Sequence, residues 1–274
     1  MSAFVISVSC KFSLLRPRLK PKVNIDPISN LINQLPEYYN GIGYLDIFGN
    51  IAGIKLENRN YQFLLNDNDK KFINNIKNQI KFTNYIKGFH LISDKDIKRT
   101  YPYPRDLIKE FLKNENDIFI INFGTTPIGI KDEKFLDCAE ANYTLREQIL
   151  IASLCDEFIT IDSAFFHIGH NIYDKPTIML VGPTNPFLSG NVSKGFYYIR
   201  KEELDCLDCY WRWENNIKCM KELFPKDLYS MIKNKKYKKV SEITTYKEIN
   251  YDGRVDLNQF MYSLYSENMN TLKY

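Results

Sequence analysis

The sequence predicts an α/β fold with a Rossmann-type parallel sheet, and three features of residues 86–186 carry this prediction. Strand-like and helix-like segments alternate along this stretch, as they do in chains that form parallel sheets. The run Asp117–Phe123 is almost wholly apolar, which is typical of a parallel strand covered on both faces. The segment Asp156–Pro186 has the pattern of strand, sharp turn, helix, strand and loop. Two strands joined in this way end at one edge of the sheet, where open α/β sheets bind ligands.

Composition limits the classes of protein that fit. A chain of 274 residues is long enough for two units, and 44% hydrophobic residues with 14% aromatics argue against disorder. The net charge of +4 is too small for a nucleic-acid-binding protein. No apolar run approaches the roughly 20 residues of a membrane span. Met1–Leu15 lacks a basic start and a clean cleavage site, so we expect no signal peptide. Six cysteines without a secretory signal favour a reducing, cytoplasmic compartment.

The first part of the chain carries weaker signals. We expect a short strand at Ala3–Val8, followed by a basic loop broken by prolines at Arg16–Lys22. That loop is either a solvated connector or a contact with an anionic surface. Apolar residues recur with helical spacing in Pro27–Leu35 and Tyr44–Ile51, and Lys70–Ile80 is predicted to be a helix with a polar face.

The pattern becomes clearer from Ile86. Gly88–Ser93 is predicted to be a strand, and the following loop contains Lys95, Lys98 and Arg99. Pro104 suits the first turn of a helix, which we expect to run to about Lys113. Tyr143–Leu154 has the apolar spacing of an amphipathic helix.

The stretch after Asp156 is the most informative part of the chain. Phe158–Ile161 and Thr177–Val181 are predicted strands, and Gly182–Pro186 is a turn-rich loop. Between the strands, Asp162 and Ser163 are good N-cap residues for a short helix that carries His167 and His170. The N–H groups of Ala164 to Phe166 should then face outward at the start of that helix. Such amides form a site for a phosphate or diphosphate.

These residues resemble a known family. The sequence Asp-Ser-Ala-Phe-Phe-His at 162–167, followed by Lys-Pro-Thr and then Gly-Pro-Thr-Asn-Pro, is similar to the donor-binding half of the ADP-heptose:lipopolysaccharide heptosyltransferases. These proteins belong to glycosyltransferase family 9, which has the two-domain GT-B fold. The family usually has glycine where Ala164 stands here, and alanine still lets a phosphate approach the backbone. The resemblance covers residues 86–223.

The resemblance implies a division of the chain and a function. Residues 85–240 would form the nucleotide-sugar-binding domain, residues 1–84 a shortened, incomplete acceptor-side domain, and residues 241–274 a tail with a final helix. The chain would transfer heptose or a similar sugar from an ADP- or UDP-linked donor to a glycan, a lipid-linked glycan such as lipopolysaccharide, or a protein. Nothing in Met1–Gln34 matches the family's glycine-rich turn with its catalytic aspartate, so no general base is assigned. The alternative is a non-catalytic nucleotide-sugar-binding or assembly module.

The resemblance also suggests roles for particular residues. The family has a lysine in the loop that contains Lys98, where a cation would stabilise the departing diphosphate without a metal. Asp162 would repel a phosphate, so it either caps the helix or accepts hydrogen bonds from the donor sugar. His167 either contacts the donor or is a buried histidine with a neighbouring partner. The predicted donor-binding residues are Ser93, Lys98, Asp162, Ser163, Ala164, His167, Gly182 and Thr184.

Three cysteines and a basic tail remain outside this assignment. Cys206, Cys209 and Cys219 are candidate ligands of a structural iron or zinc ion, although no fourth ligand follows them. Packing or reversible thiol chemistry is the alternative, and the transfer reaction itself requires no cofactor. A cysteine–metal module that binds nucleic acid is disfavoured by the small net charge. The basic run Lys233–Lys239 is either a solvated helix end or a contact with the inner face of an anionic membrane.

Overall fold

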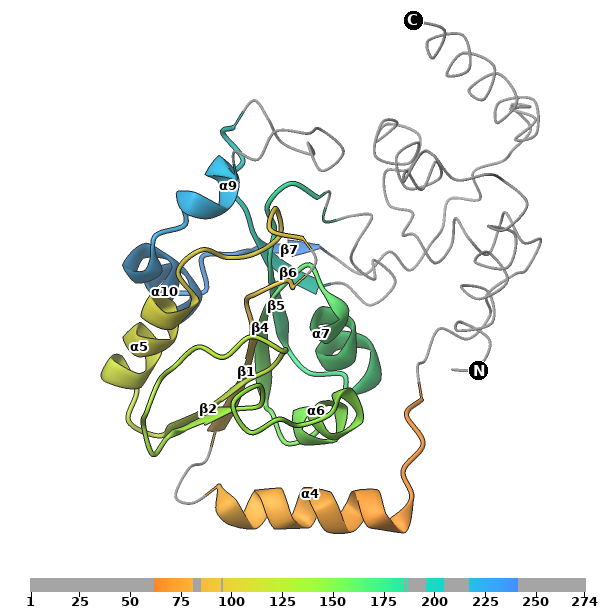
Figure 1. The fold of residues 1–274 in the computed structure, drawn as a ribbon. Helices are drawn as coiled ribbons and strands as arrows, with labels where there is room; N and C mark the ends of the chain where they lie inside the picture. Colours follow the sequence, from red (N-terminus) through yellow and green to blue (C-terminus); the bar gives the residue numbers. More distant parts are fainter. Residues whose placement is uncertain are drawn as a thin grey trace, which may run out of the picture. The chain divides into compact units, whose positions relative to one another are not determined.

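The structure is a computed structural model that describes residues 62–80, 85–94, 96–184, 186, 196–204 and 217–240. Within these residues the chain forms a seven-stranded sheet in the order β3-β2-β1-β4-β5-β6-β7 (Figure 1). All neighbouring strands are parallel except β6 and β7. The strands are β1 (Tyr85–His90), β2 (Ile118–Asn122), β3 (Phe135–Asp137), β4 (Glu157–Ile161), β5 (Thr177–Leu180), β6 (Phe196–Ile199) and β7 (Lys238–Val240). The prediction of an α/β fold with a Rossmann-type parallel sheet is confirmed.

The strand order reverses its direction at one point in the sheet. From β1 the chain moves outward to β2 and β3, and it then returns to the other side of β1 with β4, β5 and β6. This order reverses between β1 and β4, where Gly88 is opposite Phe158 and His90 is opposite Thr160. Crevices outside the carboxyl ends of strands at such a reversal are the usual ligand sites of open α/β sheets.

Helices cover the sheet on two faces, as Figure 1 shows for α5 and α10 on one side and α6 and α7 on the other. Alternate residues of β2 supply the two cores: Ile118 and Ile120 belong to the core that includes α5 and α10, and Phe119 and Ile121 belong to the other. The helical elements are α4 (Asp67–Gln79), α5 (Pro104–Asn114), α6 (Leu145–Ala152), α7 (Ala164–His167), the π-helical turn η2 (Ile168–Ile172), α9 (Lys218–Lys221) and α10 (Pro225–Lys233).

Residues at the helix starts explain several of these boundaries. Pro104 occupies the first turn of α5, where its missing N–H has no intrahelical acceptor to lose. At α6, the Thr144 hydroxyl accepts a hydrogen bond from the Glu147 amide, and the Glu147 carboxylate accepts one from the Thr144 amide at 2.7 Å. This capping box fixes the start of α6.

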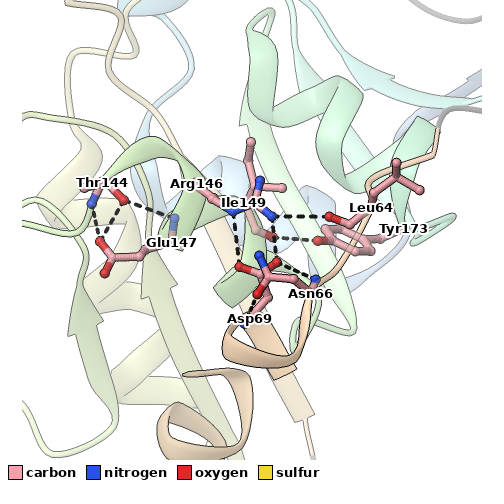
Figure 2. Close-up of polar contacts among 8 residues, drawn as sticks. All are labelled: Leu64, Asn66, Asp69, Thr144, Arg146, Glu147, Ile149 and Tyr173. Carbon is pink, nitrogen blue, oxygen red and sulfur yellow. Dashed lines mark hydrogen bonds and ion pairs between the residues drawn. The ribbon is translucent and has the colours of Figure 1, made fainter. Parts of the chain in front are cut away.

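Helix α4 is joined to α6 by a buried carboxylate (Figure 2). Asp69 caps its own helix by accepting a hydrogen bond from the Asn66 amide at 2.8 Å. The same carboxylate accepts two from Arg146, at 3.1 Å from Nε and 2.6 Å from Nη2. Arg146 also donates to the Leu64 carbonyl at 3.3 Å. The Arg146 guanidinium thus binds both Asp69 of the capping box and the Leu64 carbonyl before the helix. This holds the start of α4 against α6.

The strand predicted at Gly88–Ser93 is correct in place but wrong in its limits. Strand β1 begins at Tyr85, three residues before the predicted start at Gly88, and it ends at His90 rather than Ser93. The residues after His90 bond with their own loop instead of a neighbouring strand. The Leu91 carbonyl accepts a hydrogen bond from the Tyr101 amide at 2.9 Å, and the Ser93 amide donates to the Thr100 hydroxyl at 2.9 Å.

The other predicted elements of the described region are largely confirmed. Strands β2, β4 and β5 and helix α5 agree with their predictions to within one residue at each end. Helix α6 lies inside the predicted helix, and α4 begins three residues before the predicted start at Lys70. The helix that follows Ser163 is α-helical only to His167, and His170 lies in the π-helical turn. Within the basic run, α10 ends at Lys233 and the last residues belong to β7.

Several predictions fall outside the described residues. They include the strand at Ala3–Val8, the loop at Arg16–Lys22, the helices at Pro27–Leu35 and Tyr44–Ile51, and the tail 241–274. The limits of the proposed domains stay predictions for the same reason. Among the described helices, none has the length and apolar character that crossing a membrane demands.

Candidate functional site

The loops that follow β1 and β4 meet at the carboxyl edge of the sheet, and Arg99 joins them. Its Nη1 donates a hydrogen bond to the Asp162 carbonyl at 3.1 Å, and its Nε donates to the Asp96 carboxylate at 3.1 Å. Both side chains are mostly buried, with 28% of Arg99 and 17% of Asp96 exposed. A guanidinium is therefore fixed at the point where the strand order reverses.

Asp96 also orders the loop that contains the predicted residues Ser93 and Lys98. Its carboxylate accepts a hydrogen bond from the Lys98 amide at 3.0 Å, and its carbonyl accepts one from the Arg99 amide at 3.2 Å. The Thr100 hydroxyl lies between the amide and the carbonyl of Ser93, at 2.9 and 3.2 Å. The loop is thus a compact turn in which Lys98 is half-buried.

A second contact joins the loop after β1 to the loop after β2. The Asp94 carboxylate accepts hydrogen bonds from the hydroxyls of Thr125 and Thr126, the latter at 2.8 Å. The β2 loop begins at Gly124, which has a φ of 117° that favours glycine. Gln148 of α6 accepts from the Gly124 amide at 2.8 Å and donates to the Gly124 carbonyl at 3.1 Å.

The anion site was predicted at the start of α7, and it stays a prediction. Ser163 is the N-cap, with extended backbone, and Ala164 is exposed. The predicted outward amide at Phe166 is wrong, because this N–H donates to the Ser163 carbonyl at 3.1 Å. The amides of Ala164 and Phe165 are the first two of the helix, and such amides have no intrahelical acceptor. Since α7 has four residues, these local N–H groups matter more than a helix dipole.

Unpartnered polar atoms gather at this edge of the sheet. Within the described residues, the hydroxyls of Thr160, Ser163 and Thr184 and the Nδ1 atom of His90 are buried without a hydrogen-bond partner. They belong to the ends of β1, β4 and β5 and to the residues that follow these strands. Leaving one such group unsatisfied costs about 1–3 kcal/mol, so proteins rarely keep several together without use.

His167 has a partner of its own. Its Nδ1 lies 3.0 Å from Nδ2 of Asn171, one turn further along the chain. Because the amide group donates, Nδ1 accepts and the ring proton is on Nε2. Burial lowers the pKa of His167, and the nearby Asp162 carboxylate opposes this effect only in part. His167 is therefore a neutral, half-buried histidine whose neighbouring partner is Asn171.

Gly182 and Thr184 lie in the loop after β5. A Cβ atom on Gly182 would come within 2.8 Å of Met220 and 3.3 Å of the Cys219 sulfur. The glycine thus allows α9 to pack closely against this loop. Thr184 is buried, with 7% of its surface exposed, and its hydroxyl is one of the unpartnered groups.

The cysteine site stays a prediction. Cys219 is a buried residue of α9, whereas Cys206 and Cys209 lie outside the described residues. In the part of the chain that the structure describes, no three histidine, cysteine or acidic side chains are grouped as metal ligands.

Sequence reasoning did not single out two residues of this site. His90 lies between Phe89 and Leu91 inside the predicted strand and reads as an ordinary strand residue. Arg99 is one of several cations in its loop, and only the folded chain distinguishes it by its bond to Asp162. Because the strand was predicted to run to Ser93, the sequence did not show that His90 is its last residue.

Comparisons with known proteins agree with the fold. The crystal structure of a glycosyl transferase family 9 protein from Veillonella parvula matches with a TM-score of 0.55 and 17% identity, over 70% of this chain and 59% of its own. The ADP-heptose lps heptosyltransferase II of E. coli matches with a TM-score of 0.46 and 14% identity, over 63% of this chain and 52% of its own. E. coli heptosyltransferase WaaC with ADP-2-deoxy-2-fluoro heptose matches with a TM-score of 0.42 and 13% identity, over 69% of this chain and 54% of its own.

The likeness to the Veillonella parvula structure confirms the GT-B-like fold class and, at the level of the fold, the resemblance to family 9. The chain spans between 52% and 59% of the lengths of these three proteins. No protein-family model and no curated protein sequence matches the chain.

Proposed function

We propose that this chain is a glycosyltransferase that binds a nucleoside-diphosphate sugar at the carboxyl edge of β1, β4 and β5. The observation that carries the proposal is the cluster of unpartnered hydroxyls beside a fixed guanidinium. Arg99 bridges the loops after β1 and β4, and Ser163 and Thr184 follow the neighbouring strands β4 and β5. A diphosphate needs a cation and several hydrogen-bond donors, and this edge supplies both.

Each predicted donor residue has a role in the proposal. The amides of Ala164 and Phe165 and the Ser163 hydroxyl, after a rotation about χ1, bind the phosphate next to the sugar. Lys98 and Arg99, on one ordered turn, offset its charge. Asp162 accepts hydrogen bonds from sugar hydroxyls. Further proposed contacts come from Ser93, His167, Gly182 and Thr184.

The reaction breaks the bond between the anomeric carbon and a diphosphate oxygen. The bonding electron pair leaves with the nucleoside diphosphate, and an acceptor hydroxyl forms the new bond to carbon while it releases its proton. Donors fixed around the departing oxygen stabilise the charge that develops on it, which lowers the barrier without a metal. One lost donor in such a site typically slows turnover by about 10²–10³-fold.

The acceptor and the location are also proposals. The family-level fold is compatible with a glycan, a lipid-linked glycan or a protein as acceptor, and with heptose or a similar sugar on ADP or UDP. The exposed residues Lys235, Lys236, Lys238 and Lys239 support peripheral contact with the anionic cytoplasmic face of the inner membrane. We retain residues 85–240 as the proposed donor domain.

A thermal-shift screen tests the proposal. The full chain is heated with ADP, UDP, GDP and the corresponding nucleotide sugars, with inorganic phosphate as the control for simple anion binding. A ligand at 100 times its Kd stabilises the folded state by about 2.7 kcal/mol, which raises the Tm of a domain of this size by about 5–10 °C. We expect one nucleoside diphosphate to give such a shift.

Three variants then test the site with that nucleotide. Ser163→Ala and Arg99→Ala each remove a charge-assisted hydrogen bond and should raise Kd roughly 10- to 100-fold. Lys98→Ala tests the sequence-based cation in the same assay. Equal Kd values in all variants would reject the site. Nucleotide binding without donor hydrolysis or transfer would favour the non-catalytic binding module instead.

A further inference from the structure

His90 lies beneath the first turn of α7. It is the last residue of β1, with 9% of its surface exposed, and its ring stacks on Phe165 at a centroid distance of 4.9 Å and an angle of 29°. Phe165 also stacks on Phe123, which follows β2, at 4.8 Å and 21°. The second residue of α7 therefore rests on rings from the ends of two strands.

The His90 ring is confined on its other side by the turn after β2. A Cβ atom on Gly124 would lie 3.2 Å from Cδ2 and Nε2 of His90, so this edge of the ring leaves no easy room for a side chain on the turn. Gln148 binds both the N–H and the carbonyl of Gly124, so this turn cannot move away easily. The imidazole is held between a fixed turn and Phe165.

The opposite edge of the ring carries an unpartnered nitrogen. Nδ1 of His90 is buried without a hydrogen-bond partner among the described residues. Thr160 stands opposite His90 in the sheet, and its fully buried hydroxyl is also unpartnered, as is that of Ser163 three residues later. Unpartnered polar groups are thus present on both neighbouring strands and at the N-cap of α7.

The surroundings of His90 favour the neutral form of its imidazole. Burial lowers the pKa of His90 to about 4, Asp94 opposes this effect, and Arg99 adds to it. The ring is uncharged at neutral pH, so it stacks on Phe165 without bringing a second cation beside Arg99.

We propose that His90 is a positioning residue of the donor site: through Phe165 it fixes the turn at Ser163 and Ala164 in the geometry that receives the diphosphate. This inference rests on the proposed function. It adds that the strength of donor binding depends on an imidazole beneath the turn that does not itself touch the donor.

Two measurements test this role. Deuterium exchange of the peptide that spans residues 162–168, measured without nucleotide, reports how firmly the turn is held. Isothermal titration with the nucleoside diphosphate that shifts the Tm reports affinity. Since an aromatic stack contributes about 0.5–1.5 kcal/mol, His90→Ala should speed exchange and raise Kd about 3- to 10-fold. Phe165→Leu removes the same stack from the other side, together with the stack on Phe123, and should give changes in the same direction that are at least as large.

His170→Ala is the matched control. His170 is also a buried imidazole, with 8% exposed, and it packs on Phe166 at 5.4 Å, within the same helical segment. We expect it to change Kd less than twofold. In a double-mutant cycle, His90→Ala and Phe165→Leu together should cost little more than Phe165→Leu alone, because the second change already removes the shared stack.

The outcomes separate this inference from the proposed function. If His170→Ala has the same effect as His90→Ala, or if neither His90→Ala nor Phe165→Leu speeds exchange, the positioning role is wrong. Faster exchange with unchanged Kd also overturns it. If the unaltered chain binds no nucleotide, the proposed function fails, whatever the exchange shows. Should His90→Ala not fold, His90→Leu, which also removes the imidazole, replaces it in both measurements.

Discussion

Phe158 of β4 is enclosed by two glycines, and this contact sets how closely the α7–η2 segment lies on the sheet. A Cβ atom on Gly169, in the π-helical turn, would lie 2.6 Å from Cδ2 of the ring. A Cβ atom on Gly88 of β1 would lie 2.6 Å from Cε1 of the same ring. Because Phe158 is fully buried, its ring has no free space to move into when Gly169 is replaced by alanine.

The size of the effect follows from these distances. Overpacking a close-packed core costs about 1–3 kcal/mol, and alanine regains up to about 1 kcal/mol because it restricts the unfolded chain more than glycine. Gly169→Ala should therefore destabilise the fold by about 1–2 kcal/mol. Phe158→Leu removes ring atoms and should cost a similar amount through the space it leaves. In the double variant the new methyl group fills part of that space, so the loss should be at least about 1 kcal/mol smaller than the sum.

Urea unfolding at 25 °C, followed by circular dichroism, measures all four proteins of this cycle. The m-values should agree among them, since a change in m would indicate a different denatured state. Additivity of the two single variants within about 0.5 kcal/mol would refute the reasoning, because it would mean that the Gly169 backbone and the Phe158 ring do not press on each other.

Three further predictions use the same assay. Tyr101→Phe removes the hydrogen bond at 2.8 Å from the buried hydroxyl to the Leu223 carbonyl, and it should cost about 1–2 kcal/mol; no change in the urea midpoint would contradict it. Arg146 holds the pKa of Asp69 below its usual range, so this carboxylate stabilises the fold above its unfolded pKa of about 3.9 and loses that effect as pH falls through the folded value. Asp69→Asn should therefore be less stable than the unaltered chain at pH 6, with a smaller difference at pH 2. The pKa of His90 is lowered to about 4 from 6.5, so the unfolded state binds more protons and stability falls, by at most about 3 kcal/mol, as pH drops through this window. His90→Ala should show a shallower decline, and parallel curves would reject a neutral buried imidazole.

Local patterns were enough to predict the central strands and the main helix. The apolar run ending at Phe123 and the proline at 104 each fix an element through their nearest neighbours in sequence. Strand β3 has three residues and β6 has four, and such short segments gain their identity from pairing with a long neighbour. That pairing leaves no periodic signal in the sequence, so these strands were missed.

The candidate site could be located from the sequence but not built. The motif at Asp162 pointed to the carboxyl edge of the sheet, because the ends of parallel strands meet there. Contacts made across that edge, such as Arg99 with the Asp162 carbonyl and His90 with Phe165, join residues more than 60 positions apart. The tight approach of Gly169 to Phe158 likewise depends on the assembled sheet, and no spacing rule encodes it.

The amide resonance of Ala164 tests the central claim most directly. The full chain, labelled with ¹⁵N-alanine, is titrated with the nucleoside diphosphate that raises its Tm, and Ala164→Gly identifies the resonance. We expect the Ala164 amide proton to move downfield and to saturate with the same Kd as the thermal shift, because this N–H gains an anionic acceptor. A nucleotide that binds, saturates and leaves the Ala164 resonance unmoved would contradict the account.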